Sequence, residues 1–127
     1  MDRKRFTMSA LYLTQDLFFS SRVTGAATAC ALQMSVVADG DQLLAGMQAG
    51  SVHFVLLDFS TPGLNLLDLV PRIRAAASTP VSVIAFGPHV NVAGMAAAKQ
   101  AGCDEVYTRG QFNNQMVDIL HKHGCTV

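Results

Sequence analysis

The feature that most constrains this chain is an almost unbroken apolar run over residues 52–57 that ends directly in Asp58. A strand buried on both faces of a parallel sheet has this composition, whereas a strand with one face in water alternates apolar and polar residues. The run therefore predicts a central strand of a parallel sheet. Half of the 127 residues are apolar and 14% are charged, so the chain can fill the core of one domain, and disorder is excluded.

Short β-type runs alternate with helical patterns along the rest of the chain. The other expected strands cover residues 10–13, 34–38, 81–86 and 106–108. Apolar residues at helical spacing predict helices over about 19–30, 40–50, 66–73, 93–101 and 114–121. Five strands that are each followed by a helix imply parallel strands joined by right-handed crossovers. We therefore expect one domain over residues 1–127, with its core at about 9–121, and a doubly wound, three-layer α/β fold around a five-stranded sheet.

Charge and hydropathy exclude several classes of function. Nine basic and nine acidic side chains cancel, and the only basic cluster is residues 3–5, so no nucleic-acid partner is expected. Prolines and a glycine interrupt the charge-free stretch 75–98, which argues against a membrane span. The first residues lack the cleavage pattern of a secretory signal, and we therefore expect a cytoplasmic protein.

The three cysteines, Cys30, Cys103 and Cys125, form no Cys-x-x-Cys pair. Their odd number and their spacing argue against a disulfide framework and against a zinc site. We expect two of them to be small buried side chains and the C-terminal one to be a free thiol.

Polar side chains follow the strands at the edge of the predicted sheet where ligands usually bind. In parallel α/β sheets, reactive groups gather beyond the carboxyl ends of the strands. The residues at these ends are Thr14, Gln15 and Asp16 after the first strand, Asp58 after the third, residues 85–89 with His89 after the fourth, and Arg109 after the fifth. A carboxylate directly after a buried strand is costly unless it is solvated or paired. Asp58 is thus either a loop-anchoring carboxylate or a reactive group.

The segment Val55-Leu-Leu-Asp-Phe-Ser-Thr-Pro-Gly63, continued to Arg74, resembles the centre of a response-regulator receiver domain. Residues 80–86 and 98–104 are similar to the segments around the fourth and fifth strands of that family, and the resemblance extends from Ser9 to about His121. It implies the flavodoxin-like fold with strand order 2-1-3-4-5 and five helices. It also implies a two-component phosphorelay module. In that family a histidine kinase phosphorylates an aspartate with Mg²⁺ bound, and the face of the fourth helix, fifth strand and fifth helix then rearranges.

The metal-binding positions of the family are only partly kept. Asp58 matches the phosphoacceptor, but the acidic pair that holds Mg²⁺ falls on Thr14 and Gln15. Neither supplies a negative oxygen, and Mg²⁺ prefers carboxylates and waters. Asp16 and Asp58 remain as candidate metal ligands. The resemblance therefore implies Mg²⁺ binding that is absent or weak, with a dissociation constant on the order of millimolar or poorer, and no other cofactor.

The positions that act on the phosphoryl group also differ. The family's hydroxyl residue falls on Ala85, its lysine on Arg109, and its switch aromatic on Val106, whereas Tyr107 is out of phase and should face the other side of the sheet. Phosphoryl transfer depends on metal and fixed donors that neutralise charge. We therefore expect a degenerate pocket in which Asp58 and Arg109 form an ion pair and hold one conformation without phosphate.

The function that these patterns favour is a non-enzymatic signalling or protein-interaction module whose partner is a histidine kinase or another signalling protein. A nucleophile and a base cannot be placed together from the sequence, which argues against an enzyme. One alternative is a working receiver with Asp58 as acceptor, Asp16 as metal ligand and Arg109 as charge clamp. Another is a small-anion or ligand binder whose pocket is lined by Thr14, Gln15, Asp58, His89 and Arg109. If the chain dimerises, the resemblance implies the face of the fourth helix, fifth strand and fifth helix.

Overall fold

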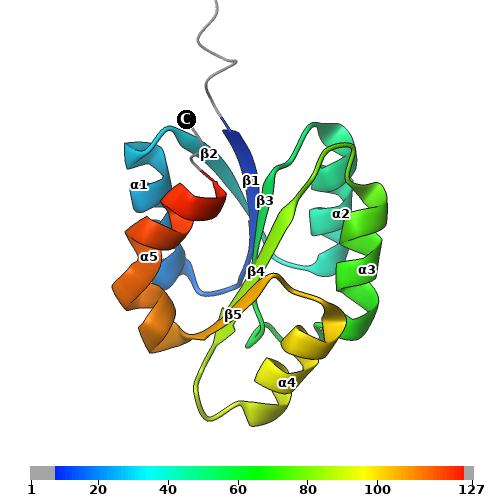
Figure 1. Cartoon of the computed structure of the whole chain (residues 1–127), viewed down its shortest axis with the longest axis vertical. Helices are drawn as coiled ribbons and strands as arrows, with labels where there is room; N and C mark the ends of the chain where they lie inside the picture. The colour runs from blue at the N-terminus through cyan, green and yellow to red at the C-terminus, as the bar shows by residue number, and fades with distance from the viewer. Residues whose placement is uncertain (1–7, 125–127) are drawn as a thin grey trace, which may run out of the picture.

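A computed structural model describes residues 8–124 of the chain. Its five parallel strands lie in the order β2-β1-β3-β4-β5, which confirms the predicted fold and strand order (Figure 1). The strands are β1 (Met8–Leu13), β2 (Leu32–Val37), β3 (Phe54–Asp58), β4 (Ser82–Gly87) and β5 (Glu105–Thr108). The helices are α1 (Leu17–Ala29), α2 (Gly40–Ala49), α3 (Leu66–Ala76), α4 (Val92–Ala101) and α5 (Arg109–His123).

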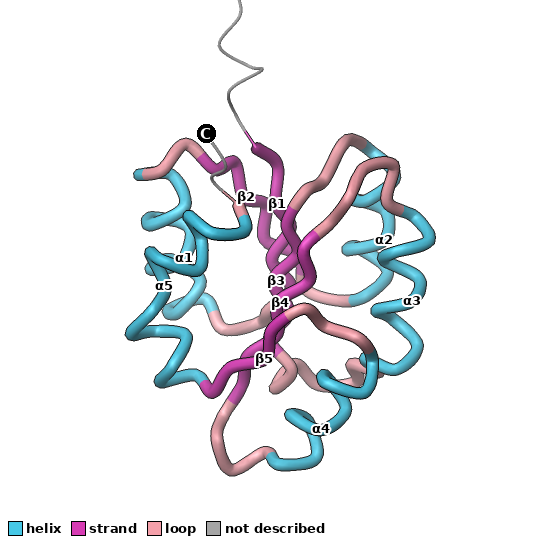
Figure 2. Tube along the Cα trace, viewed as in Figure 1, coloured by secondary structure: helices cyan, strands magenta, loops and turns pink. Residues whose placement is uncertain are grey.

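The sheet separates two layers of helices. Helices α1 and α5 lie side by side on one face, and α2, α3 and α4 cover the other (Figures 1 and 2). Alternate residues of each strand supply the two cores, so Phe54 and Leu56 of β3 pack toward α1 and α5, and Val55 and Leu57 pack toward the other three helices. All five residues of β3 are buried. The apolar run thus marks the central strand, as predicted.

Helix α5 begins five residues earlier than the apolar spacing predicts. Thr108 is its N-cap and its side chain accepts a hydrogen bond from the Gln111 backbone N–H, while the Gln111 side chain accepts from the Thr108 N–H. This reciprocal capping box satisfies two backbone donors of the first turn. The helix can therefore start directly after β5 although its first turn holds few apolar residues, and Arg109 is its first residue.

The expectation for the cysteines is wrong for Cys30, which is half-buried and forms a disulfide. Its partner lies outside the described residues, as does Cys125, for which a free thiol was predicted. Cys103 is a free, half-buried thiol that packs against the apolar cluster of α2, α3 and α4, and burial raises its pKa to about 11. Over residues 8–124, no helix is long and apolar enough to cross a membrane.

Candidate functional site

Asp58 ends the central strand and is buried, with 2% of its surface exposed. The Thr14 hydroxyl donates to its Oδ2 at 2.7 Å. The backbone N–H and the hydroxyl of Ser60 donate to its Oδ1 at 3.0 and 2.5 Å. Because both carboxylate oxygens have donors from the chain itself, the cost of burying the charge is offset without a cation.

A second carboxylate, Asp16, stands beside this group. Its backbone N–H donates to the Thr14 hydroxyl at 3.1 Å, which connects it to Asp58 through one side chain. Asp16 is the N-cap of α1 and accepts from the Phe19 N–H at 3.0 Å, and it forms an ion pair with Arg109. The Phe19 N–H and then the Arg109 guanidinium hold the pKa of Asp16 below its usual value.

The predicted ion pair between Asp58 and Arg109 is wrong. In the part of the chain that the structure describes, Arg109 pairs with Asp16, and its guanidinium lies over the Phe19 ring at 4.5 Å from the centroid. Arg109 is the first residue of α5, which packs beside α1, and its guanidinium reaches the Asp16 carboxylate at the N-cap of α1. Asp58 is left to the hydroxyls of Thr14 and Ser60.

The other predicted pocket residues form no hydrogen bond or ion pair with Asp58 in residues 8–124. Gln15 is exposed and donates to the Ala38 carbonyl at 3.2 Å. Ala85 is fully buried in β4 and supplies no polar side-chain atom. His89 is exposed in the loop between β4 and α4. The structure thus joins four of the predicted residues, Thr14, Asp58, Asp16 and Arg109, in one network.

Two features of the site were missed by sequence reasoning. Ser60 holds Asp58, and the Asp-x-Ser spacing of an Asx turn is a signal that could have shown it. Beneath the network, an aromatic cluster packs against α1 and α5, formed by Tyr12, Phe19, Phe86 and Phe112. Among residues 8–124, the buried Tyr12 hydroxyl has no hydrogen-bond partner, and burial raises the pKa of Tyr12 above its usual value.

Several solved structures share this architecture, although no protein-family model and no curated protein sequence matches the chain. The receiver domain of a Pseudomonas aeruginosa PAO1 sensor histidine kinase, with magnesium in its active-site cleft, gives a TM-score of 0.77 at 18% identity, over 92% of this chain and 97% of that one. A Saccharomyces cerevisiae complex of the phosphotransfer protein Ypd1 with the receiver domain of Ssk1 gives a TM-score of 0.77 at 14% sequence identity. The match covers 94% of this chain and 90% of the matched chain. The receiver domain of the response regulator TorR gives a TM-score of 0.75 at 21% sequence identity, over 91% of this chain and 98% of that one. This chain has the receiver fold.

The residues at the positions that the sequence resemblance assigns to metal binding do not suit Mg²⁺. Thr14 offers a hydroxyl that already donates to Asp58, and Gln15 turns to the Ala38 carbonyl. Asp16 is neutralised by Arg109. Over residues 8–124, no group of three or more histidine, cysteine, aspartate or glutamate side chains could hold a metal ion. Proteins bind Mg²⁺ through carboxylate oxygens that are not already paired with a cation, together with waters. The side chains at this position therefore do not match the ion.

The positions that the sequence resemblance assigns to the switch residues, Ala85 and Val106, are apolar in this chain. Ala85 and Val106 are register partners in β4 and β5 and pack in the cluster of α2, α3 and α4. Tyr107 packs on the opposite side, against the cluster of α1 and α5, as its phase in the strand predicts. Neither Ala85 nor Val106 has a polar side-chain atom that could respond to a charge at Asp58.

A separate charged cluster ties the end of α5 to β5. Glu105 accepts from Lys122 at 2.7 Å and from the Tyr107 hydroxyl, and His123 Nε2 lies 3.0 Å from its Oε1. Burial acts to raise the pKa of Glu105, but the hydrogen bonds from Lys122 and Tyr107 and the nearby His123 imidazole outweigh it and lower that pKa to about 2. Burial, and secondly the hydrogen bond to Glu105, raise the pKa of Tyr107 to about 12. His123 also stacks on Phe54 with 6.4 Å between ring centroids, so this cluster anchors the C-terminal turn of α5.

Acid should weaken this anchor. Because the folded pKa of Glu105 lies below its ordinary value of 4.5, its contribution to stability is complete above about pH 5 and is lost as the pH falls toward 2. We expect Glu105→Gln to lower the free energy of unfolding at pH 7 and to flatten its dependence on pH between 5 and 2. Urea unfolding at a series of pH values measures both. Asp41→Asn is the control, since Asp41 has no ion pair in residues 8–124, and an equal flattening in that variant would contradict the assignment.

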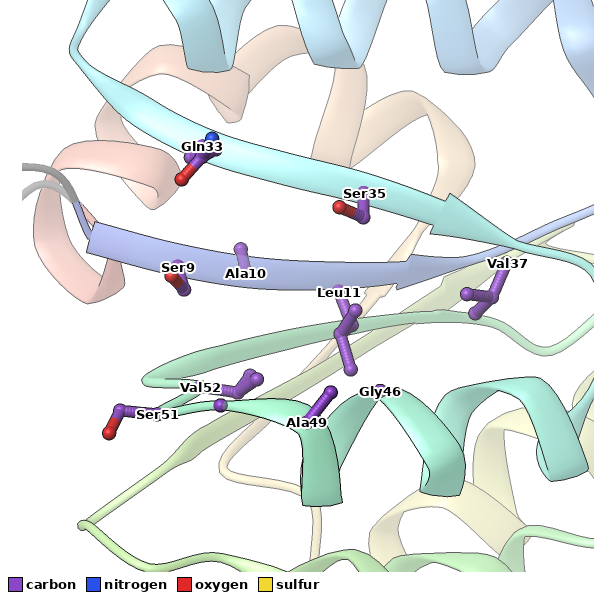
Figure 3. Close-up of a pocket in the computed structure, with 11 residues that line it drawn as sticks. Ser9, Ala10, Leu11, Gln33, Ser35, Val37, Gly46, Ala49, Ser51 and Val52 are labelled. Atoms are coloured by element: carbon purple, nitrogen blue, oxygen red, sulfur yellow. The ribbon is translucent and has the colours of Figure 1, made fainter.

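A hollow of about 310 Å³ lies beside β1, β2 and α2 (Figure 3). Serine, glutamine and small apolar side chains line it, including Ser9, Gln33, Ser35 and Val52, and no titratable group does. Leu11 fills its floor close to Gly46, where an added Cβ would lie 2.9 Å from the leucine Cδ1. The lining offers no charge and no base that could activate its serine hydroxyls, so we assign it no reaction.

Proposed function

We propose that this chain is a signalling and protein-interaction module of the two-component phosphorelay type that works without phosphorylation of Asp58. The observation that carries the proposal is the closed network around Asp58, in which Thr14 and Ser60 occupy both carboxylate oxygens and Arg109 is bound to Asp16. The receiver fold and its near-complete coverage support the class of module. In this proposal the chain catalyses no reaction of its own. It acts in the cytoplasm.

The partner that we propose is a protein, either a histidine kinase, a phosphotransfer protein or another signalling protein. In the Saccharomyces cerevisiae complex, a receiver domain is crystallised with a phosphotransfer protein. Here, apolar side chains are exposed where the segments leave the carboxyl edge of the sheet, with Leu17 74%, Val90 75% and Val92 72% exposed. These side chains are free to contact a protein partner at that edge.

Treatment with acetyl phosphate or beryllofluoride, with and without Mg²⁺, tests the proposal. We expect no covalent adduct by mass spectrometry and no change in the amide NMR shifts of residues 58–61, because Thr14 and Ser60 already donate to Asp58 and Arg109 is bound to Asp16. The triple variant Thr14→Asp, Gln15→Asp, Ala85→Thr restores the family's ligands and should gain an Mg²⁺-dependent adduct. An adduct on the unmodified chain that Asp58→Asn abolishes would establish instead the alternative of a working receiver with Asp58 as acceptor.

A further inference from the structure

A groove runs between α1 and α5 on the outer side of their layer. Two adjoining hollows of about 540 and 270 Å³ share Arg22 and Asn113 as lining residues. The larger is also lined by Ala26, Val117 and Asp118, and the smaller reaches the start of α5. Helices α1 and α5 pack against each other on one face of the sheet (Figure 1), and both hollows are lined by residues of both helices.

The groove carries two opposite charges that have no partner. Most charged side chains of residues 8–124 form an ion pair or a hydrogen bond within the chain. The side chains for which the described structure shows neither are Arg22, Asp41, Lys99 and Asp118. Arg22 on α1 and Asp118 on α5 line the same hollow and are both exposed. The Arg22 guanidinium and the Asp118 carboxylate therefore line one groove without forming an ion pair with each other.

Exposed apolar side chains accompany these charges. Phe18 is 92% exposed and lies one turn before Arg22 on α1, so the two side chains share a stripe of the helix. Val117 of α5 is 58% exposed and lines the larger hollow beside Asp118. An aromatic ring and a valine next to an unpaired charge pair are the components of a protein interface rather than of a solvated face.

We propose that the α1/α5 face binds a second copy of this chain around a two-fold axis. In such an interface each contact occurs twice, with residue i of one copy against residue j of the other. Arg22 of one copy then meets Asp118 of the partner subunit, and the exposed Phe18 and Val117 are covered. Because the α1/α5 face carries both Arg22 and Asp118, two copies of the same face can neutralise both charges without a different partner. Packing α1 and α5 against their copies gives a four-helix arrangement with about 20 Å of helix on each element.

The face of α4, β5 and α5 is less suited to this role in the present chain. Its acidic residue Glu105 already binds Lys122 and lies beside His123 within one chain. A partner copy would have to break these contacts to use them. The smaller hollow of the groove reaches Arg109 of the Asp58 network. The contacts proposed here use Arg22, Asp118 and the apolar side chains beside them, none of which belongs to that network, so the proposal goes beyond the proposed function and does not rest on it.

Sedimentation equilibrium over a concentration series, in low salt, tests the dimer. We expect the unmodified chain to associate with a micromolar dissociation constant, and Arg22→Glu or Asp118→Arg alone to weaken association by about tenfold or more, which corresponds to about 1.4 kcal/mol. Each single variant sets like charges against each other. An equimolar mixture of the two variants should regain the affinity of the unmodified chain, because opposite charges then meet at both contacts.

Matched controls separate this interface from general effects of charge. Lys99→Glu on α4 and Asp41→Arg on α2 change the net charge by the same amount away from the groove and should leave association unchanged. Phe18→Ser should weaken it, with thermal unfolding showing that the variant is folded. A chain that stays monomeric throughout the series, single variants that associate like the unmodified chain, or a mixture that fails to associate would each overturn the proposal.

Discussion

Gly87→Ala is expected to destabilise the protein by about 3 kcal/mol, at the upper end of what overpacking of a core commonly costs. An added Cβ at Gly87 would lie 2.2 Å from Cε1 of the Phe59 ring, and one at Gly94 would lie 2.6 Å from its Cδ1. The ring thus fills the space between the end of β4 and the first turn of α4. It cannot easily retreat, because Phe59 is buried and its backbone N–H donates to the Phe86 carbonyl at 2.9 Å.

Urea unfolding of matched glycine variants measures this effect. Gly25→Ala in α1 meets no atom within 4 Å, so it should stabilise the protein by about 0.5–1 kcal/mol through helix propensity alone. The double variant Gly87→Ala, Phe59→Leu should recover part of the loss, since the smaller side chain leaves room for the methyl group. A neutral Gly87→Ala would show that the ring moves freely.

Thr14→Val is expected to destabilise the protein by about 1–3 kcal/mol, the cost of leaving a buried acceptor unsatisfied. The substitution keeps the shape of the side chain and removes the hydroxyl that donates to Asp58 Oδ2 at 2.7 Å. Asp58→Asn should also destabilise, because its amide NH₂ would face donors instead of acceptors. Thr14→Ser, which keeps a hydroxyl, should cost less than Thr14→Val.

A double-mutant cycle in urea identifies the partner of Asp58. Thr14→Val and Asp58→Asn should show a clear coupling energy, since each removes one side of the same hydrogen bond. Arg109→Ala and Asp58→Asn should be additive, because Arg109 binds Asp16. Coupling in the second pair without coupling in the first would restore the ion pair that the sequence predicts and would contradict the network described above.

The sequence by itself determined the sheet and the place of Asp58 in it. The apolar run 52–57 identifies a strand buried on both faces, and strand periodicity separates Val106 from Tyr107 on opposite sides of the sheet. These are local signals, because a run of apolar residues and the two-residue alternation of strand faces can both be seen in consecutive residues. The start of α5 was also within reach, since Thr108 and Gln111 have the spacing of a capping box.

Only the tertiary structure decided which charges pair. The carboxyl edge of the sheet gathers Thr14, Asp16, Asp58 and Arg109 within one region, and nothing in their spacing ranks one carboxylate above the other as the partner of Arg109. The choice depends on where the start of α5 lies relative to α1. The packing of Phe59 against Gly87 and Gly94 is likewise absent from the local pattern. Both depend on side chains from elements far apart in the chain, whose relative positions are fixed only once the helices have packed on the sheet.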